Sequence, residues 1–434
     1  MKRFLFFVLT GFFLIFTLAA QEEAAQGAAS LDWDIDTVFD DPSGNTEKRE
    51  EENKQNEKKP EPSSSPAAGL IKKRGFTFDA SFRFVGGLVP GWDEAPWHFD
   101  ENKNYSTNPS VKLKASIGLD ARISEALGVK STVYFEVPNS SSSSNLRFFL
   151  DELFFDYSFY DVVFLRAGKF SLNWGISRNY GFANLLSRIP DSGYNRDPFM
   201  LKIDIPVGIG GIQLLVLTRA NLMGGVTPNA DDFAYGGKYN LAHPWFDMDI
   251  GLFYQKGMDL RGFLSLKTTL WNTEFYNEWL GDLDVENRNG FSGAVSLGFM
   301  REFFNRKFSV NAEIFYNAEK NAIWYSPETD IRSGRDYLFL EGFNLALNML
   351  FRFGGRGNPR LFVQTLYAVN EYSARIIPGF RLSPWSNIDI YFAVPMSLGS
   401  KNGYYYSHNE DKDNRPFSFA LLVSVTGSVR ASHY

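Results

Sequence analysis

The chain has 434 residues, with 44 Lys and Arg against 50 Asp and Glu, a formal net charge of −6 and no Cys. Without a thiol there is no disulfide, Cys-ligated metal centre, nucleophilic Cys or lipid-modified Cys. A mean hydropathy of −0.23 is far too low for a helical membrane protein. The acidic balance argues against a nucleic-acid partner.

The first 20 residues have the order of a secretory signal. Lys2 and Arg3 precede an apolar run that ends in Ala19 and Ala20. A basic start, an apolar centre and a small-residue end are the parts of a cleaved signal peptide. The run is also just long enough for an uncleaved membrane anchor, which is the alternative. We predict that residues 1–20 are a signal peptide that directs export across the inner membrane.

Residues 21–74 carry most of the acidity. Between Glu22 and Arg74 there are 13 acidic and eight basic residues, together with the tracts EKREEENKQNEKK and PEPSSSP. Because so few apolar residues cannot offset the entropy of ordering, we expect a disordered periplasmic leader. Residues 31–41, LDWDIDTVFDD, are either a short docking segment within it or a chance apolar cluster.

From Gly75 onwards, apolar residues recur at every second position. Residues 76–84, 111–123 and 417–425 each place apolar side chains on one face and mostly polar side chains on the other. A period of two predicts strands. Strands of about nine to 13 residues with one apolar face are typical of a membrane barrel with lipid outside and water inside, whereas soluble sandwiches have shorter strands.

The alternation predicts 18 strands. Their expected ranges are 76–84, 111–123, 129–137, 146–157, 162–170, 199–206, 211–219, 233–242, 247–256, 260–269, 272–279, 290–301, 307–317, 340–353, 360–370, 374–382, 387–397 and 417–425. Residues 267–280 could instead form one strand, which leaves 16 strands open. We therefore predict an all-β fold, a transmembrane antiparallel β-barrel of 16–18 strands over residues 75–434.

The connections differ in length on the two sides of the predicted barrel. Those after even-numbered strands are short, and those after odd-numbered strands are mostly long, except at 257–259 and 371–373. Outer-membrane barrels have short periplasmic turns and long extracellular loops. Aromatic residues near strand ends fit girdles at the membrane interfaces. These are Trp174, Tyr180, Trp245, Trp271, Trp279, Trp324, Tyr325, Trp385 and Tyr404 to Tyr406.

Residues 151–175 read DELFFDYSFYDVVFLRAGKFSLNWG. They resemble the outer-membrane porin superfamily of carbohydrate-, phosphate- and alginate-type barrels, through Glu152, Tyr157, Gly168, Lys169, Trp174 and Gly175. The resemblance implies a channel inserted by the barrel-assembly machinery. Such barrels usually end on an aromatic residue in phase with apolar positions, but the even-numbered residues before Tyr434 are polar.

We expect no catalytic site, cofactor or metal. The four His residues are scattered, and none accompanies a Ser and Asp set. The loop NEDKDN lacks the central Gly and the later Glu of a calcium loop. The GGRG at 354–357 precedes no helix, so it is a turn rather than a phosphate loop.

The longest connection, residues 171–198, contains three Arg and two Asp: Arg178, Arg188, Arg196, Asp191 and Asp197. A loop of this length either caps a large barrel or folds inward, where its charges set solute preference. An external loop with no role in the pore is an equal alternative. Strand alternation adds Arg83, Lys112, Lys114, Asp120 and Arg122 as pore-lining candidates. In the strand 162–170 the alternation fails, because Arg166 and Lys169 fall on opposite faces.

A barrel of this size leaves an aqueous channel unless it is plugged. We predict an outer-membrane porin-like channel for passive diffusion of small hydrophilic solutes, surrounded by outer-membrane lipid. A homo-oligomer is compatible with this. The alternatives are a non-conducting surface barrel that acts as an adhesin or scaffold, and a transporter of hydrophobic ligands.

Overall fold

The computed structural model describes residues 75–92, 105–137, 147–172, 174–179, 199–218, 228–256, 260–283, 285, 291–318, 342–354, 357–399, 405 and 417–433. The predicted signal peptide and leader lie outside the described residues. In the described ranges, no helix is long and apolar enough to cross a membrane.

The described residues form antiparallel strands. Their bounds are β1 Gly75–Trp92, β2 Tyr105–Arg122, β3 Leu127–Val137, β4 Arg147–Phe159, β5 Val163–Lys169, β6 Phe199–Val207, β7 Gly210–Thr218, β8 Phe233–His243, β9 Phe246–Gln255, β10 Leu260–Leu270, β11 Thr273–Leu283, β12 Phe291–Phe303, β13 Phe308–Asn317, β14 Gly342–Arg352, β15 Arg360–Ala368, β16 Ser373–Trp385, β17 Ile388–Ala393, β18 Met396–Gly399, β19 Phe417–Ser418 and β20 Ala420–His433.

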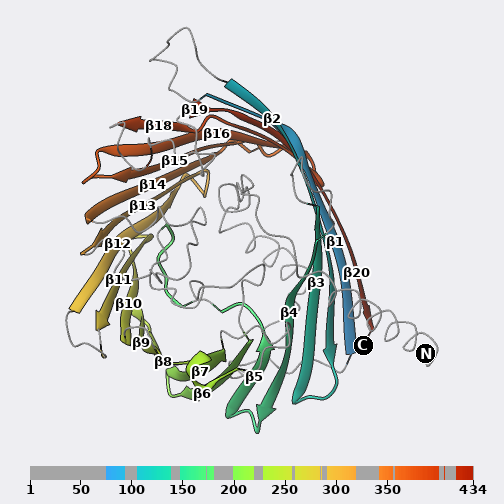
Figure 1. Cartoon of the computed structure of the whole chain (residues 1–434), viewed down its shortest axis with the longest axis vertical. Coiled ribbons are helices and arrows are strands. Elements are labelled where there is room, and N and C mark those ends of the chain that lie inside the picture. The colour runs from blue at the N-terminus through green and yellow to red at the C-terminus, as the bar shows by residue number, and fades with distance from the viewer. Residues whose placement is uncertain are drawn as a thin grey trace.

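Each strand pairs with its neighbours in the chain, and β1 pairs with both β2 and β20, which closes the barrel (Figure 1). β17 and β18 are two parts of one strand, since both pair with β16 and only Val394 and Pro395 separate them. β19 and β20 are likewise separated by Phe419 alone. The described chain is therefore a closed barrel of 18 antiparallel strands, which confirms the predicted fold.

Two expectations about the strands need correction. The alternative of 16 strands is wrong, because Trp271 and Asn272 have positive φ angles of 49° and 58° and form a tight turn between β10 and β11. The first hairpin is longer than expected: β1 extends to Trp92 and β2 begins at Tyr105. The residues VGGLVPGW do not alternate between apolar and polar, so the sequence pattern ends before the strand does.

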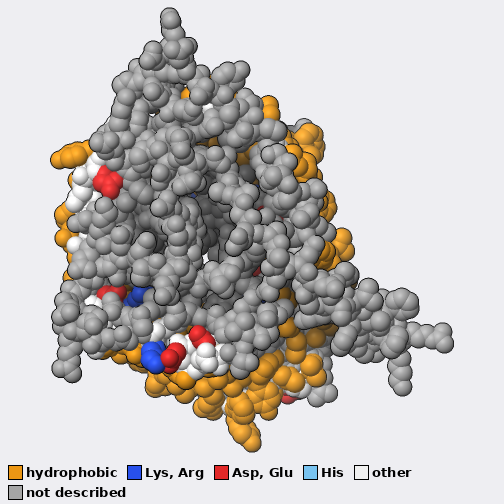
Figure 2. Space-filling model, in the orientation of Figure 1, with side chains coloured by type: hydrophobic (Ala, Val, Ile, Leu, Met, Phe, Trp, Pro, Cys, Tyr) orange, Lys and Arg blue, Asp and Glu red, His pale blue; other side chains and the backbone are white. Residues whose placement is uncertain are grey.

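The outer face of the wall is apolar. Outward positions on successive strands carry exposed Phe, Leu, Ile and Tyr side chains, for example Phe78, Leu214, Ile250, Leu297 and Phe392. Figure 2 shows hydrophobic side chains around the circumference, with acidic and basic side chains inside that outline. A closed barrel with an apolar outer face satisfies its own backbone hydrogen bonds, as a membrane-spanning structure must.

The last strand explains the unusual C-terminal pattern. β20 continues to His433 and pairs with β1 as far as Phe76. Its odd positions, such as Leu421 and Val423, are exposed on the outer face, whereas Leu422 and Ser424 are buried. The even, polar positions therefore face the interior.

The interior has two zones, which differs from the uniformly polar lumen that alternation predicts. Near the long-loop ends of the strands it is closely packed: Phe253, Phe263, Leu280, Phe315 and Leu366 belong to one apolar cluster, and buried polar side chains such as Arg261 and Asp282 lie at the same ends. Towards the short turns it carries charged side chains. On the side of the short turns, partly exposed acid–base pairs line the interior of β3 to β11.

A charge introduced on the outer face should destabilise the barrel. Ile250 lies on this face near the middle of the wall, so Ile250→Arg should cost about 2–4 kcal/mol. Thr269→Arg introduces the same side chain at an exposed interior position opposite Glu274 and should cost little. Urea titration of protein refolded in lipid vesicles measures both, and equal costs would contradict the assigned faces.

Candidate functional site

The chain turns into the barrel directly after β5. We define the inward segment as residues 170–172 and 174–179. It leaves β5 and runs along the inner side of the wall (green trace in Figure 1). Gly168 has a φ of 134°, and a Cβ there would lie 2.1 Å from the Leu153 carbonyl oxygen, so only glycine fits.

The same bend explains why alternation fails around Lys169. β4 contains one extra residue, Asp151, since Thr132 pairs with Glu152 while Val133 pairs with Leu150. The buried Lys169 donates from Nζ to the Leu150 carbonyl at this bulge, over 2.7 Å. Lys169, which breaks the apolar–polar alternation of its strand, therefore stabilises the point where the chain leaves the wall.

Aromatic packing anchors the first half of the inward segment. Phe170 and Trp174 are fully buried; the Phe170 ring lies 5.6 Å from that of Phe154, and the Trp174 ring lies 5.5 Å from that of Phe263. A Cβ at position 236 would approach the Trp174 ring to 2.6 Å, so Gly236 makes room for it. Trp174 is therefore an interior anchor, and its prediction as a girdle residue is wrong.

A polar chain connects Trp174 to the charged wall. Its indole N–H donates to Gln213 Oε1 over 2.6 Å, and Gln213 Nε2 donates to Asp204 Oδ1 over 2.8 Å. Asp204 also forms an ion pair with Lys202, at 2.8 Å. Gln213 thus orients both the loop anchor and an interior ion pair.

Carboxylates of β11 and β13 hold the second half. The Ile176 backbone N–H and the Ser265 hydroxyl both donate to Glu278, which is fully buried. Glu313 accepts hydrogen bonds from the Ser177 hydroxyl and from the backbone N–H and side-chain amide of Asn179, the last two at 2.9 and 3.1 Å. Hydrogen bonds to charged acceptors are among the stronger ones in proteins.

Neighbouring side chains complete this attachment. The Tyr276 hydroxyl lies within hydrogen-bond distance of two acceptors, Asn311 Oδ1 at 2.9 Å and Glu313 Oε2 at 3.1 Å, and shares its one proton between them. Asn348 Nδ2 donates to Asn179 Oδ1 over 2.5 Å. The second half of the inward segment is therefore held by hydrogen bonds to β11, β12, β13 and β14, rather than lying free in the lumen.

Arg178 forms an ion pair within the barrel. Its guanidinium contacts Glu274 Oε1 from Nη2 at 2.7 Å and from Nε at 3.2 Å, and Lys267 contacts the other oxygen of Glu274 at 3.0 Å. Two cations therefore share one carboxylate. The described part of residues 171–198 is therefore folded inward, which is one of the arrangements expected for that connection.

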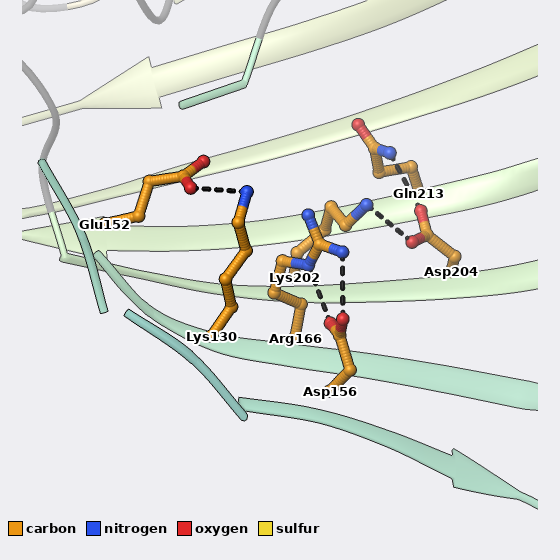
Figure 3. Close-up of polar contacts among 7 residues, drawn as sticks. All are labelled: Lys130, Glu152, Asp156, Arg166, Lys202, Asp204 and Gln213. Atoms are coloured by element: carbon orange, nitrogen blue, oxygen red, sulfur yellow. Dashed lines mark hydrogen bonds and ion pairs between the residues drawn. The ribbon is translucent and has the colours of Figure 1, made fainter. Parts of the chain in front are cut away.

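Acid–base pairs continue along the interior from β3 to β11. They are Lys130–Glu152 at 2.6 Å, Arg166–Asp156 at 2.7 Å, Lys202–Asp204 at 2.8 Å, Lys238–Asp249 at 2.8 Å and Lys267–Glu274 at 3.0 Å. Figure 3 shows the first three pairs and Gln213 on adjacent strands. We call these five pairs the charge ladder. Each base has an acid beside it, so the ladder has little net charge.

The remaining candidates divide into two groups. Arg83, Lys114, Asp120 and Arg122 lie on β1 and β2, on the polar positions that alternation assigns to the interior. Arg83 is beside Lys114 across the two strands, and its Nε donates to Ser424 over 3.2 Å. Lys112 lies on β2 with its side chain outside the described residues. Arg188, Asp191, Arg196 and Asp197 also lie outside them.

Sequence reasoning missed Glu274 and Glu278. Both lie on the even-numbered, interior face of β11. They alternate with Phe275, Asn277 and Trp279 in the sequence, and this alternation is the signal that identifies them. Within the described ranges, His, Asp and Glu side chains form no group of three that could hold a metal ion.

No protein-family model matches the sequence, and no curated protein matches it either. Several solved structures are similar. OccAB1 of Acinetobacter baumannii is 10% identical with a TM-score of 0.50 over 85% of this chain and all of that chain. OccAB2 of the same organism is 9% identical with a TM-score of 0.47 over 81% of this chain and 98% of its own.

A Rhodopseudomonas blastica porin variant is 8% identical, with a TM-score of 0.42 over 81% of this chain and all of the porin. At these identities the likeness concerns the fold. The similarity to OccAB1 therefore confirms the expected barrel architecture.

Removing the Glu313 carboxylate should loosen the inward segment. In Glu313→Gln an amide faces hydrogen-bond donors from Ser177, Asn179 and Tyr276, so at least one loses its acceptor. Limited proteolysis of refolded protein should then cleave residues 171–198 several-fold faster. Glu302→Gln is the control, because Glu302 pairs with Arg306. Equal cleavage rates in both variants would show that Glu313 does not hold the segment.

Proposed function

We propose that the chain is an outer-membrane channel for passive diffusion of small hydrophilic solutes. The observation that carries the proposal is a closed barrel of 18 strands with an apolar outer face and a charge ladder inside. Barrels of 16 to 18 strands are wide enough to leave an aqueous channel. The porin-like fold of the similar structures supports the same function.

The charge ladder supports a preference for solutes with little net charge. Each Lys or Arg in it lies within 3.0 Å of an Asp or Glu. Because opposite charges this close cancel beyond a Debye length of about 8–10 Å, the wall presents many local hydrogen-bonding groups but a weak long-range field. Neutral polar and zwitterionic solutes are suited to such a surface.

The inward segment supports a narrowed channel at the level of Glu274 and Arg178. We propose that Arg178, with Arg188, Asp191, Arg196 and Asp197 further along the same connection, contributes to the constriction. Arg83, Lys112, Lys114, Asp120 and Arg122 line the opposite side of the path.

The packing of the interior near the long loops argues against a transporter of hydrophobic ligands. The apolar side chains of the cluster near the long loops, among them Phe253, Phe315 and Leu366, are less than 10% exposed. They act as packing within the barrel and present little open surface to a hydrophobic ligand. Diffusion of polar solutes past the charged zone is therefore the better-supported function.

Residues outside the described ranges complete the proposal. A signal peptide at 1–20 and a periplasmic leader at 21–74 would precede the barrel of residues 75–434. The barrel-assembly machinery would insert it among outer-membrane lipids, as a single barrel or a homo-oligomer.

Single-channel recording in planar bilayers tests the function. The refolded protein should give stepwise, ohmic conductance with weak ion selectivity. Arg178→Gln should shift the reversal potential in a salt gradient towards cations, and Glu274→Gln should shift it towards anions, because each removes one charge from the same pair.

The two substitutions are matched controls for one another. Shifts of the same sign, or no shift, would remove this pair from the channel. A correctly folded barrel that never conducts would overturn the channel proposal and favour a surface-binding scaffold.

A further inference from the structure

Three arginines lie side by side on the interior face of β14, β15 and β16, which are neighbours in the wall (Figure 1). Arg352 is directly opposite Arg360, and Arg360 is directly opposite Arg381. Their sequence neighbours Leu361 and Phe380 are exposed on the outer face, so the three arginines face the interior. We call them the arginine row. It lies near the strand ends that the short turns connect.

The arginine row gives this side of the opening an excess of positive charge. The described parts of 302–309, 352–360 and 381–389 contain five basic and two acidic residues, a net charge of +3. They are Arg306, Lys307, Arg352, Arg360 and Arg381, against Glu302 and Asp389. Like charges directly opposite one another on neighbouring strands destabilise a sheet. The charge ladder sets an acid beside each base, whereas this side of the wall favours an additional anionic partner.

The two carboxylates flank the arginine row. Asp389 Oδ2 lies 3.0 Å from Nη2 of Arg381. Glu302 lies 3.3 Å from Nε of Arg306 and 4.0 Å from Nη1 of Arg352. The central Arg360 has an arginine opposite it on each neighbouring strand. Negative charge added at the middle of the row would therefore offset the repulsion among all three guanidinium groups.

The chain itself contains an anionic segment of suitable length. Residues 22–41 hold seven acidic residues and no basic one, and five of the seven lie in LDWDIDTVFDD, residues 31–41. We call residues 31–41 the acidic segment; it lies outside the described residues. In an extended chain Asp32, Asp34 and Asp36 fall on one side, about 6.7 Å apart. The three guanidinium groups stand on adjacent strands about 4.8 Å apart, so the two sets of charges are similar in extent.

The leader can reach the arginine row. It enters the barrel at Gly75, at the end with the short turns, and the wall continues from β1 through β20 and β17 to β16. At about 4.8 Å per strand, Arg381 is about 14 Å and Arg352 about 24 Å around the wall. Residues 42–74 would connect the two partners, and a flexible chain of that length spans about 30 Å on average. A tether matched to its span raises the effective concentration to the millimolar range.

We propose that the acidic segment binds the arginine row and lies across the periplasmic opening on the side of β14 to β16. The partner of this basic surface is thus a part of the same chain. The inference goes beyond the channel proposal and does not require conduction. It also gives the leader a function, because its neutral tract around residues 48–59 then acts as the tether.

Distances between spin labels test the contact, because the chain has no Cys and single thiols can be introduced. Refolded mature protein, residues 21–434, would carry Thr37→Cys with Ser386→Cys, an exposed position in the turn between β16 and β17. A second pair joins Thr37→Cys to Ile209→Cys, in the turn between β6 and β7 on the opposite side of the barrel (Figure 1). Pulsed electron paramagnetic resonance should give a short, narrow distance for 37–386 and a longer one for 37–209. A leader that does not bind would give broad distributions for both pairs.

Charge substitutions in the leader identify which residues bind. Replacing Asp32, Asp34 and Asp36 with Asn should reduce the short-distance population of the 37–386 pair several-fold. The matched control removes the same number of charges from the tether, by replacing Glu50, Glu51 and Glu52 with Gln, and should leave that population unchanged. Salt at 1 M should also reduce it, since the Debye length falls to about 3 Å.

The wall side of the contact is tested by Arg360→Gln. This substitution relieves repulsion within the row, so the barrel should still fold, but the short-distance population should fall several-fold. Lys256→Gln is the control, because Lys256 pairs with Asp231 near the long loops. Broad distances in the unsubstituted protein, or equal effects of a variant and its control, would overturn the proposal.

A solute site on the arginine row gives a different result. In that case the Asp substitutions would leave the 37–386 distances unchanged, while Arg360→Gln would shift the reversal potential in planar bilayers towards cations. That outcome would overturn the proposed contact and assign the row to anionic solutes. A short 37–386 distance that depends on both sets of charges, in a protein that never conducts, would support the contact while rejecting the channel.

Discussion

A strand in a membrane must pair its backbone groups with other protein, because the lipid core offers no hydrogen-bond partner. The pairing of β1 with β20 is how this chain meets that requirement, through a ladder from Phe76–His433 to Leu88–Leu421. Once the sheet is closed, alternate side chains must face either lipid or lumen. The apolar outer face, the interior charge ladder and the enclosed space for an inward segment all depend on this closure.

Inside the closed barrel, the inward segment also has backbone groups that need hydrogen-bond partners. The inward segment is not a strand, so its backbone N–H groups need other acceptors. Glu278 and Glu313 provide these for Ile176 and Asn179. The carboxylates in turn have their charge dispersed over several donors, including Ser265 and Tyr276. The inward segment therefore supplies hydrogen-bond donors to the carboxylates of the wall, and these carboxylates supply acceptors to the backbone of the segment.

The sequence predicted much of the wall, because a period of two is a local property. It could not predict the attachment of the inward segment, since Ile176 meets a carboxylate 102 residues away and Asn179 one 134 residues away. Trp174 was assigned to a girdle from its place at a strand end, but a positive φ at Gly168 redirects the chain inward. A backbone conformation at one glycine and contacts between residues far apart in the sequence leave no periodic pattern, so alternation does not reveal them.

Closure also has a consequence for how the chain folds. The ladder that seals the barrel joins residues at opposite ends of the described chain, so it forms only after the intervening strands have been brought together. Contacts of such sequence separation carry a large loop-closure entropy and make folding slow. Until that seam forms, β1 and β20 each present an unpaired edge open to pairing with other chains. The chain is therefore most exposed to aggregation during assembly, before β1 and β20 have paired.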